Sequence, residues 1–173
     1  NSYANSFIGG TGTGTDTLSY SEAASGVTVN VTSAGAGTSS GDGADVFTGF
    51  ENYTLSSNAD TANLSGVFGS TIDGGALSDT ASYSSVAASL TVTVDSGNTS
   101  ARVSDGTKTD TLQSIEKIIG GDGNDTFIVS NVSEINTLDG DGGNNTLKLS
   151  EETYDLKYNT ITISGTGVAW SSN

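Results

Sequence analysis

Short runs in which apolar and polar residues alternate recur along the chain. The clearest are Gly26–Val31, Ser89–Val94 and Tyr158–Ile163. A period of two places successive side chains on opposite faces of a strand, so one face of each run is buried and the other is solvated. Segments rich in Gly and Asp separate the runs, and no stretch has a helical period. The pattern therefore predicts an all-β fold.

A second, shorter pattern begins with an acidic residue or Asn and continues with a polar and then an apolar position. Its seven copies begin at Asp16, Asp45, Asp60, Asp79, Asp110, Asp125 and Asn145. Thr follows in six of the seven copies, with Val46 the exception, and the position after it is apolar every time. Each copy predicts a polar turn that leads into a short strand with one buried face.

The chain also repeats over a longer distance. Asp16 aligns with Asp79 at an offset of 63 residues, Asp45 with Asp110 at 65, and Asp79 with Asn145 at 66. A unit of about 65 residues therefore occurs about two and a half times. Repeats that cannot bury an apolar face alone must stack on their neighbours. This organisation predicts a right-handed parallel β-solenoid, or β-roll, of stacked short strands with Gly- and Asp-rich turns.

The predicted solenoid covers residues 1–150. Its units run roughly over residues 8–71, 72–137 and, in part, 138–150. We expect the runs at 26–31 and 89–94 to form longer coils or hairpin excursions at equivalent places in two units. Residues 151–173 are predicted to form C-terminal capping or continuing strands.

The composition narrows the possible functions. The chain has 20 acidic and 5 basic residues, a formal charge of -15, 33% apolar residues, and no Pro, Cys, Met or His. The absence of Cys and His excludes zinc and iron–sulfur sites built on those residues, disulfides and His-based catalytic triads. Five basic side chains are too few to form the phosphate-contacting surface that nucleic-acid binding needs. No apolar window is long enough to span a membrane. Low apolar content with high charge is typical of disorder, but the alternating runs argue against it.

Gly-rich turns precede several of the short motifs. The fullest, Gly120–Asp125, continues with Thr126-Phe127-Ile128 and resembles the nonapeptide of the RTX (repeats-in-toxin, haemolysin-type) family, a calcium-binding parallel β-roll. Close copies are Ser40–Asp45 and Thr11–Asp16, whereas Gly74–Asp79 loses the fourth glycine and Gly140–Asn145 ends in Asn. The repeats are therefore degenerate versions of the family pattern.

The resemblance implies that several Ca²⁺ ions are bound between stacked turns. Calcium takes six to eight oxygen ligands, and glycines let a turn direct carbonyl oxygens inward while carboxylates supply charge. The candidate ligands are Gly120, Asp122, Asp125, Asp139, Asp141, Asn145, Asp42, Asp45, Asp16, Asp60, Asp73, Asp79 and Asp110. A second interpretation is open: aspartates in Gly-rich turns also accept hydrogen bonds from their own backbone.

The resemblance further implies an extracellular, calcium-dependent structural or adhesive module, as in a surface layer, a filament or a giant adhesin, which folds and assembles as calcium binds. Copies of itself or neighbouring repeats are the expected partners, and cell-surface polysaccharide is a further candidate. The alternative is an accessory calcium-binding module of a secreted enzyme whose catalytic domain lies elsewhere. The chain is not expected to be an enzyme itself, because one Arg and four scattered Lys do not assemble a catalytic base.

Overall fold

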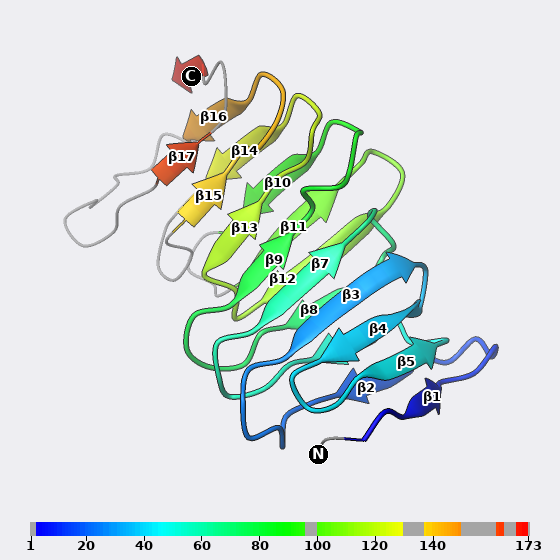
Figure 1. The fold of residues 1–173 in the computed structure, drawn as a ribbon. Helices are drawn as coiled ribbons and strands as arrows, with labels where there is room; N and C mark the ends of the chain where they lie inside the picture. The colour runs from blue at the N-terminus through cyan, green and yellow to red at the C-terminus, as the bar shows by residue number, and fades with distance from the viewer. Residues whose placement is uncertain (1–2, 96–99, 130–136, 150–161, 165–168, 173) are drawn as a thin grey trace.

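The computed structural model describes residues 3–95, 100–129, 137–149, 162–164 and 169–172. The described chain contains eighteen strands in two nine-stranded sheets, so the predicted all-β class is confirmed. No described segment forms a helix of the length and apolarity needed to cross a bilayer. Figure 1 shows the strands arranged from the N-terminus at one end of the molecule to the C-terminus at the other.

The two sheets are called sheet A and sheet B here. Sheet A contains, in spatial order, β1 (Ser6–Ile8), β5 (Asp45–Thr48), β4 (Ala36–Ser40), β3 (Thr28–Ser33), β7 (Thr61–Leu64), β9 (Thr80–Ser82), β13 (Lys117–Ile119), β15 (Thr137–Asp139) and β17 (Thr162–Ser164). Sheet B contains β2 (Thr17–Ser19), β6 (Asn52–Thr54), β8 (Thr71–Asp73), β12 (Thr109–Gln113), β11 (Ser100–Ser104), β10 (Thr91–Val94), β14 (Thr126–Val129), β16 (Thr146–Leu149) and β18 (Ala169–Ser172).

The chain passes back and forth between the sheets. After β5 it enters sheet B at β6, returns to sheet A at β7, and continues to alternate, so that β7 pairs with β9 and β6 with β8, both in parallel. Two antiparallel meanders interrupt the alternation: β3–β4–β5 in sheet A and β10–β11–β12 in sheet B. They begin in the runs at 26–31 and 89–94, as predicted for hairpin excursions.

Equivalent strands of the two repeats lie in opposite sheets. Strand β2 is in sheet B and its equivalent β9 in sheet A, while the first meander is in sheet A and the second in sheet B. If each meander counts as one pass, the repeat contains five passes between the sheets. Because five is odd, each repeat starts in the sheet opposite to the one before it. Strand β17 pairs with β15, and β18 pairs with β16. In the same way, β12 pairs with β8 and β13 with β9.

The core lies between the sheets and takes one or two inward side chains from each of the strands β2 to β16. In sheet A the aligned residues Ala62, Ala81, Ile118 and Leu138 are all at most 1% exposed. In sheet B Val92, Phe127 and Leu147 form a similar row. The apolar position of the short motif is thus the inward one, and burial of these rows stabilises the stack by about 25 cal/mol per Å² of apolar surface. The predicted C-terminal segment 151–173 lies largely outside the described residues.

Candidate functional site: a ladder of buried side-chain acceptors

Acidic and Asn side chains join neighbouring strands at their starts. In eight parallel pairs, the residue at the start of the later strand accepts a hydrogen bond from the backbone N–H of the residue at the same level in the earlier strand. The bonds run from Asn5 to Asp45 (2.9 Å), Asp16 to Glu51 (3.0 Å), Val27 to Asp60 (2.6 Å), Asp60 to Asp79 (2.7 Å), Ser70 to Asp110 (2.8 Å), Asp79 to Glu116 (2.7 Å), Leu90 to Asp125 (2.7 Å) and Asp125 to Asn145 (2.9 Å). We call these eight acceptors the strand-start ladder.

Burial makes these bonds important for stability. The six ladder residues Asp45, Asp60, Asp79, Asp110, Asp125 and Asn145 are at most 3% exposed. A buried carboxylate is costly unless it is hydrogen-bonded, and a bond between a carboxylate and a backbone N–H is charge-assisted. The backbone N–H groups at the strand starts are satisfied by the same bonds. The short motif therefore needs an acceptor as its first residue.

Two of the turns also close on their own aspartates, the Gly-rich turn before Asp125 and the turn without glycine before Asp60. The second oxygen of Asp125 accepts the N–H of Gly121 at 2.8 Å, and that of Asp60 accepts the N–H of Ser56 at 2.7 Å. In both cases the donor lies four residues before the aspartate. Both oxygens of Asp125 therefore bind backbone amides, the role that the second interpretation of these turns gives to aspartates. Burial raises the pKa of Asp125, while the two amides lower it.

Each repeat places a tyrosine next to one ladder aspartate. In the second repeat Asp110 accepts three backbone N–H groups, from residues 68–70, and the hydroxyl of Tyr83 at 3.0 Å. In the first repeat the hydroxyl of Tyr20 lies 2.6 Å from Ser39 Oγ and 3.4 Å from Asp45. Burial raises the pKa of Asp110 and holds the pKa of Tyr83 well above its usual value.

Asp79 lacks the second hydrogen bond that Asp60 and Asp125 receive from the backbone of their own turns. It is 0% exposed, and its Oδ2 has no hydrogen-bond partner among the described residues. The expected donor, the N–H of Gly75, instead bonds Asp73 Oδ1 at 3.2 Å. Burial raises the pKa of Asp79 to about 7; the amide of Asp60 lowers it, and the charges of Asp60, Glu116 and Asp73 raise it further.

Asn145 shows how the same position is satisfied in the next repeat. Its Oδ1 accepts the N–H of Asp125, as Asp79 Oδ1 accepts that of Asp60. Its Nδ2 donates to the carbonyl oxygens of Gly140 and Gly142, both at 2.9 Å. The replacement of the closing acid by Asn thus keeps the ladder bond and supplies donors on the other side.

Two Gly- and Asp-rich turns stack directly. Residues 120–125 and 140–145 are joined by bonds from Gly142 N to Gly121 O at 3.1 Å and from Asn144 N to Asn124 Oδ1 at 2.8 Å. Asp122 and Asp141 are exposed on these turns, and Asp139 Oδ1 accepts the N–H of Asp141 at 3.1 Å. The structure therefore places the predicted ligands Asp122, Asp139 and Asp141 on or beside two directly stacked turns.

The other predicted ligands are dispersed. Asp16 and Asp42 are half-buried in turns of the first repeat, and Asp73 bonds the backbone of its own turn. Gly120 is buried beside Asp125 and donates its N–H to the Asp139 carbonyl at 2.7 Å. Within the described ranges, no three acidic side chains gather closely enough to hold a metal ion. Calcium binding by these residues stays a prediction.

Glu51 and Glu116 are ladder residues that the sequence did not mark as site residues. The signal was available, since Glu51 and Glu116 occupy the same place in the two aligned repeats, 65 residues apart. Neither glutamate begins a copy of the acid-Thr-apolar motif, because the residue after it is Asn52 in one case and Lys117 in the other. A longer side chain performs at these strands the role that Asp performs elsewhere.

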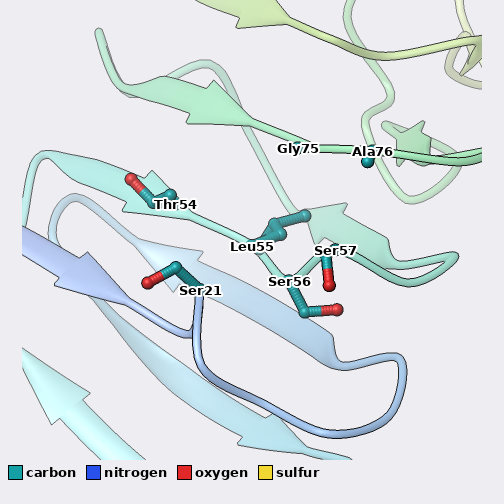
Figure 2. A pocket seen from close by; sticks show the side chains of 7 residues that line it. All are labelled: Ser21, Thr54, Leu55, Ser56, Ser57, Gly75 and Ala76. Carbon is teal, nitrogen blue, oxygen red and sulfur yellow. The ribbon is translucent and has the colours of Figure 1, made fainter.

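One shallow hollow lies on the turns that follow β2, β6 and β8 (Figure 2). It measures about 210 Å³ and is lined by Ser21, Thr54, Leu55, Ser56, Ser57, Gly75 and Ala76. Its polar side chains are hydroxyls, and that of Ser56 already donates to Asp60 at 2.9 Å. The lining contains no acid or base, so the hollow has no evident chemistry.

Comparison with protein-family models, with curated proteins and with solved structures finds no match to this chain.

Proposed function

We propose that this chain is a structural repeat module of an extracellular protein, wound as a right-handed parallel β-solenoid. The observation that carries the proposal is the strand-start ladder. Eight side-chain acceptors, six of them at most 3% exposed, join one pass of the chain to the next. A protein that places its acidic residues in this way uses them to build an extended scaffold, and right-handed crossovers are the rule for parallel strands.

The same proposal includes calcium at the stacked turns 120–125 and 140–145. Asp122 and Asp141 are exposed there and take no part in the ladder, so their carboxylates have the oxygen chemistry that Ca²⁺ prefers. Asp125 lies behind them with both oxygens on backbone amides. A bound cation would relieve the repulsion among these carboxylates and stabilise the folded chain, which fits a protein that works where calcium is abundant.

The test is a thermal melt followed by far-UV circular dichroism, in calcium and in excess EGTA. We expect chelation to lower the melting temperature of the wild-type chain, and the double variant Asp122→Asn/Asp141→Asn to melt at the same temperature in both buffers. Glu22→Gln, which removes an exposed charge outside these turns, is the matched control and should keep the response of the wild type.

Amide exchange in EGTA tests the scaffold independently. The N–H groups of Val27, Asp60 and Leu90 should exchange slowly, because buried side chains accept them. Rapid exchange at all three would refute the ladder. An unchanged melt in EGTA would remove calcium from the proposal and leave the scaffold intact.

A further inference from the structure

Six aspartates of this chain are followed directly by glycine. An aspartate in this position is open to a spontaneous rearrangement, because glycine has no side chain to shield its backbone nitrogen from the carboxyl group before it. The sequence contains no Asn-Gly pair, in which the same reaction starts from an amide. The six pairs begin at Asp42, Asp73, Asp105, Asp122, Asp139 and Asp141.

The rearrangement joins the backbone nitrogen of the glycine to Cγ of the aspartate. The nitrogen gives up its proton and the carboxyl group gives up a hydroxyl, which leave together as water and close a succinimide ring. A water molecule then opens the ring at either of its carbonyl carbons. One opening restores aspartate, and the other gives isoaspartate, in which the main chain runs through the former side chain. The reaction therefore needs a glycine N–H and a carboxyl group that are both available.

Backbone hydrogen bonds occupy the glycine N–H in three of the six pairs. A bonded N–H must leave its acceptor before the nitrogen can attack, so these pairs are protected in the folded chain. The bonds run from Gly74 to Gln113 O (2.9 Å), from Gly106 to Ser104 Oγ (3.1 Å) and from Gly142 to Gly121 O (3.1 Å).

The carboxylates of three pairs are also held in place. Oδ1 of Asp73 accepts the N–H of Gly75, that of Asp105 accepts the N–H of Lys108 at 2.8 Å, and that of Asp139 accepts the N–H of Asp141. Asp42 is half-buried in its turn, which restricts the rotation of its side chain.

Asp122-Gly123 differs from the other five pairs. The Asp122 side chain is exposed, and in the described part of the chain neither its carboxylate nor the N–H of Gly123 makes a hydrogen bond. No other pair combines an exposed carboxylate with two unbonded reacting groups. The folded structure thus protects five of the six pairs and leaves this one open.

The turn around Gly123 has no room for a longer main chain. A methyl group on Gly123 would lie 2.5 Å from the Ala88 carbonyl oxygen and 2.6 Å from Ser89 N. The N–H of the next residue, Asn124, donates to Ser89 Oγ at 3.1 Å. Isoaspartate inserts one carbon atom into the main chain just before this contact, so the modified chain should be less stable than the unmodified one.

We propose that Asp122 is a modification site, at which the chain converts to isoaspartate through a succinimide formed with Gly123. The same carboxylate belongs to the calcium site of the proposed function. A calcium ion that held it would keep it away from the Gly123 nitrogen, so calcium should slow the conversion. Only this effect of calcium rests on the proposed function.

The experiment is a long incubation of the 173-residue chain at neutral pH in EGTA, in calcium, and in EGTA with denaturing urea. Peptide mass spectrometry with fragment ions that distinguish isoaspartate from aspartate follows each pair. In EGTA, we expect conversion at Asp122 to be at least about fivefold faster than at each other pair, the factor that corresponds to one retained hydrogen bond. In urea the six rates should become similar, because the protecting bonds are lost.

Asp122→Glu is the matched variant, since it keeps the charge but its longer side chain does not form the succinimide. It should show no conversion at residue 122 and unchanged rates at the other five pairs. Asp122→Asn should reach the same succinimide faster, by loss of ammonia.

Equal rates at Asp105 and Asp122 in the folded chain would overturn the proposal. Rapid conversion at Asp122 that calcium does not slow would support the modification site and remove Asp122 from the calcium site.

Discussion

The carboxylate of Glu116 accepts the backbone N–H of Asp79 at 2.7 Å, and Glu116 N donates in return to the Asp79 carbonyl at 3.2 Å. Glu51 and Asp16 make the same pair of contacts, at 3.0 and 3.1 Å, in the opposite sheet. Two strand starts are thus locked together by a reciprocal contact that recurs once per repeat. This pair of contacts marks equivalent positions in the two repeats, although the strands that carry it lie in opposite sheets.

The first prediction concerns Glu116. Glu116→Ala should lower the free energy of unfolding by about 1–2 kcal/mol, because the Asp79 N–H loses its acceptor in a part-buried site. Glu116→Gln should cost clearly less, since its amide oxygen can still accept that bond. Urea denaturation of both variants measures the difference. Equal losses in the two variants would mean that packing of the side chain, and not the hydrogen bond, stabilises this strand start.

The second prediction uses a matched pair of glycines. A methyl group on Gly74 would lie 2.1 Å from the Ser114 carbonyl oxygen and 2.7 Å from Asp79 Oδ2, so two neighbouring levels would have to separate. Gly14 has no atom within 4 Å of the same position. Gly74→Ala should therefore destabilise the chain by about 2 kcal/mol or more, and Gly14→Ala should change its stability by at most about 0.5 kcal/mol. Thermal melts of the two variants decide the point. A neutral Gly74→Ala would show that these levels pack loosely.

Much of the fold could be predicted from the sequence, because alternation and self-similarity are local signals. The short motif fixes which residue faces the core in the seven strands that it begins, and the runs at 26–31 and 89–94 stood out by their length. The exchange of sheets between repeats was not predictable in this way. It depends on whether a repeat contains an odd number of passes, and that in turn depends on each meander staying within one sheet.

The candidate site was harder to predict, for a physical reason. A carboxylate in a Gly-rich turn looks the same in sequence whether it faces a cation or a backbone amide. Both oxygens of Asp125 accept backbone amides, although its turn carries the fullest RTX-like motif. Asp122, in the same turn, is exposed. The choice between these roles depends on which N–H groups the neighbouring level leaves unpaired, and only the register of the strands decides that.

The third prediction compares the two tyrosine–aspartate pairs. Tyr83→Phe removes the only side-chain donor to Asp110 seen in the described residues and should lower the free energy of unfolding by about 1–2 kcal/mol. Tyr20→Phe should cost less, because Ser39 Oγ still donates to Asp45 at 3.2 Å. Chemical denaturation of both variants tests the order. A larger loss for Tyr20→Phe would contradict the contacts on which the comparison rests.

The fourth prediction concerns pH and Asp79. Its pKa is raised from 3.8 to about 7 in the folded chain, chiefly by burial, so the folded state binds a proton that the unfolded state has lost above its own pKa. That contribution is fully present below pH 4 and is lost as the pH rises toward 7. Between pH 5 and pH 8 the wild-type chain should thus lose about 2 kcal/mol of stability at this site.

Asp79→Asn isolates this contribution from the other acids. Asn can keep the bond from the Asp60 N–H. Its amide can donate where Asp79 Oδ2 finds no partner in the described part of the chain, as Asn145 does at the equivalent position. The variant should be more stable than the wild type at pH 8, and the gain should shrink at pH 5. Urea titrations of both proteins at the two pH values measure it. Parallel pH dependence in wild type and variant would show that Asp79 is ionised throughout, and that its buried oxygen is satisfied by a group other than a proton.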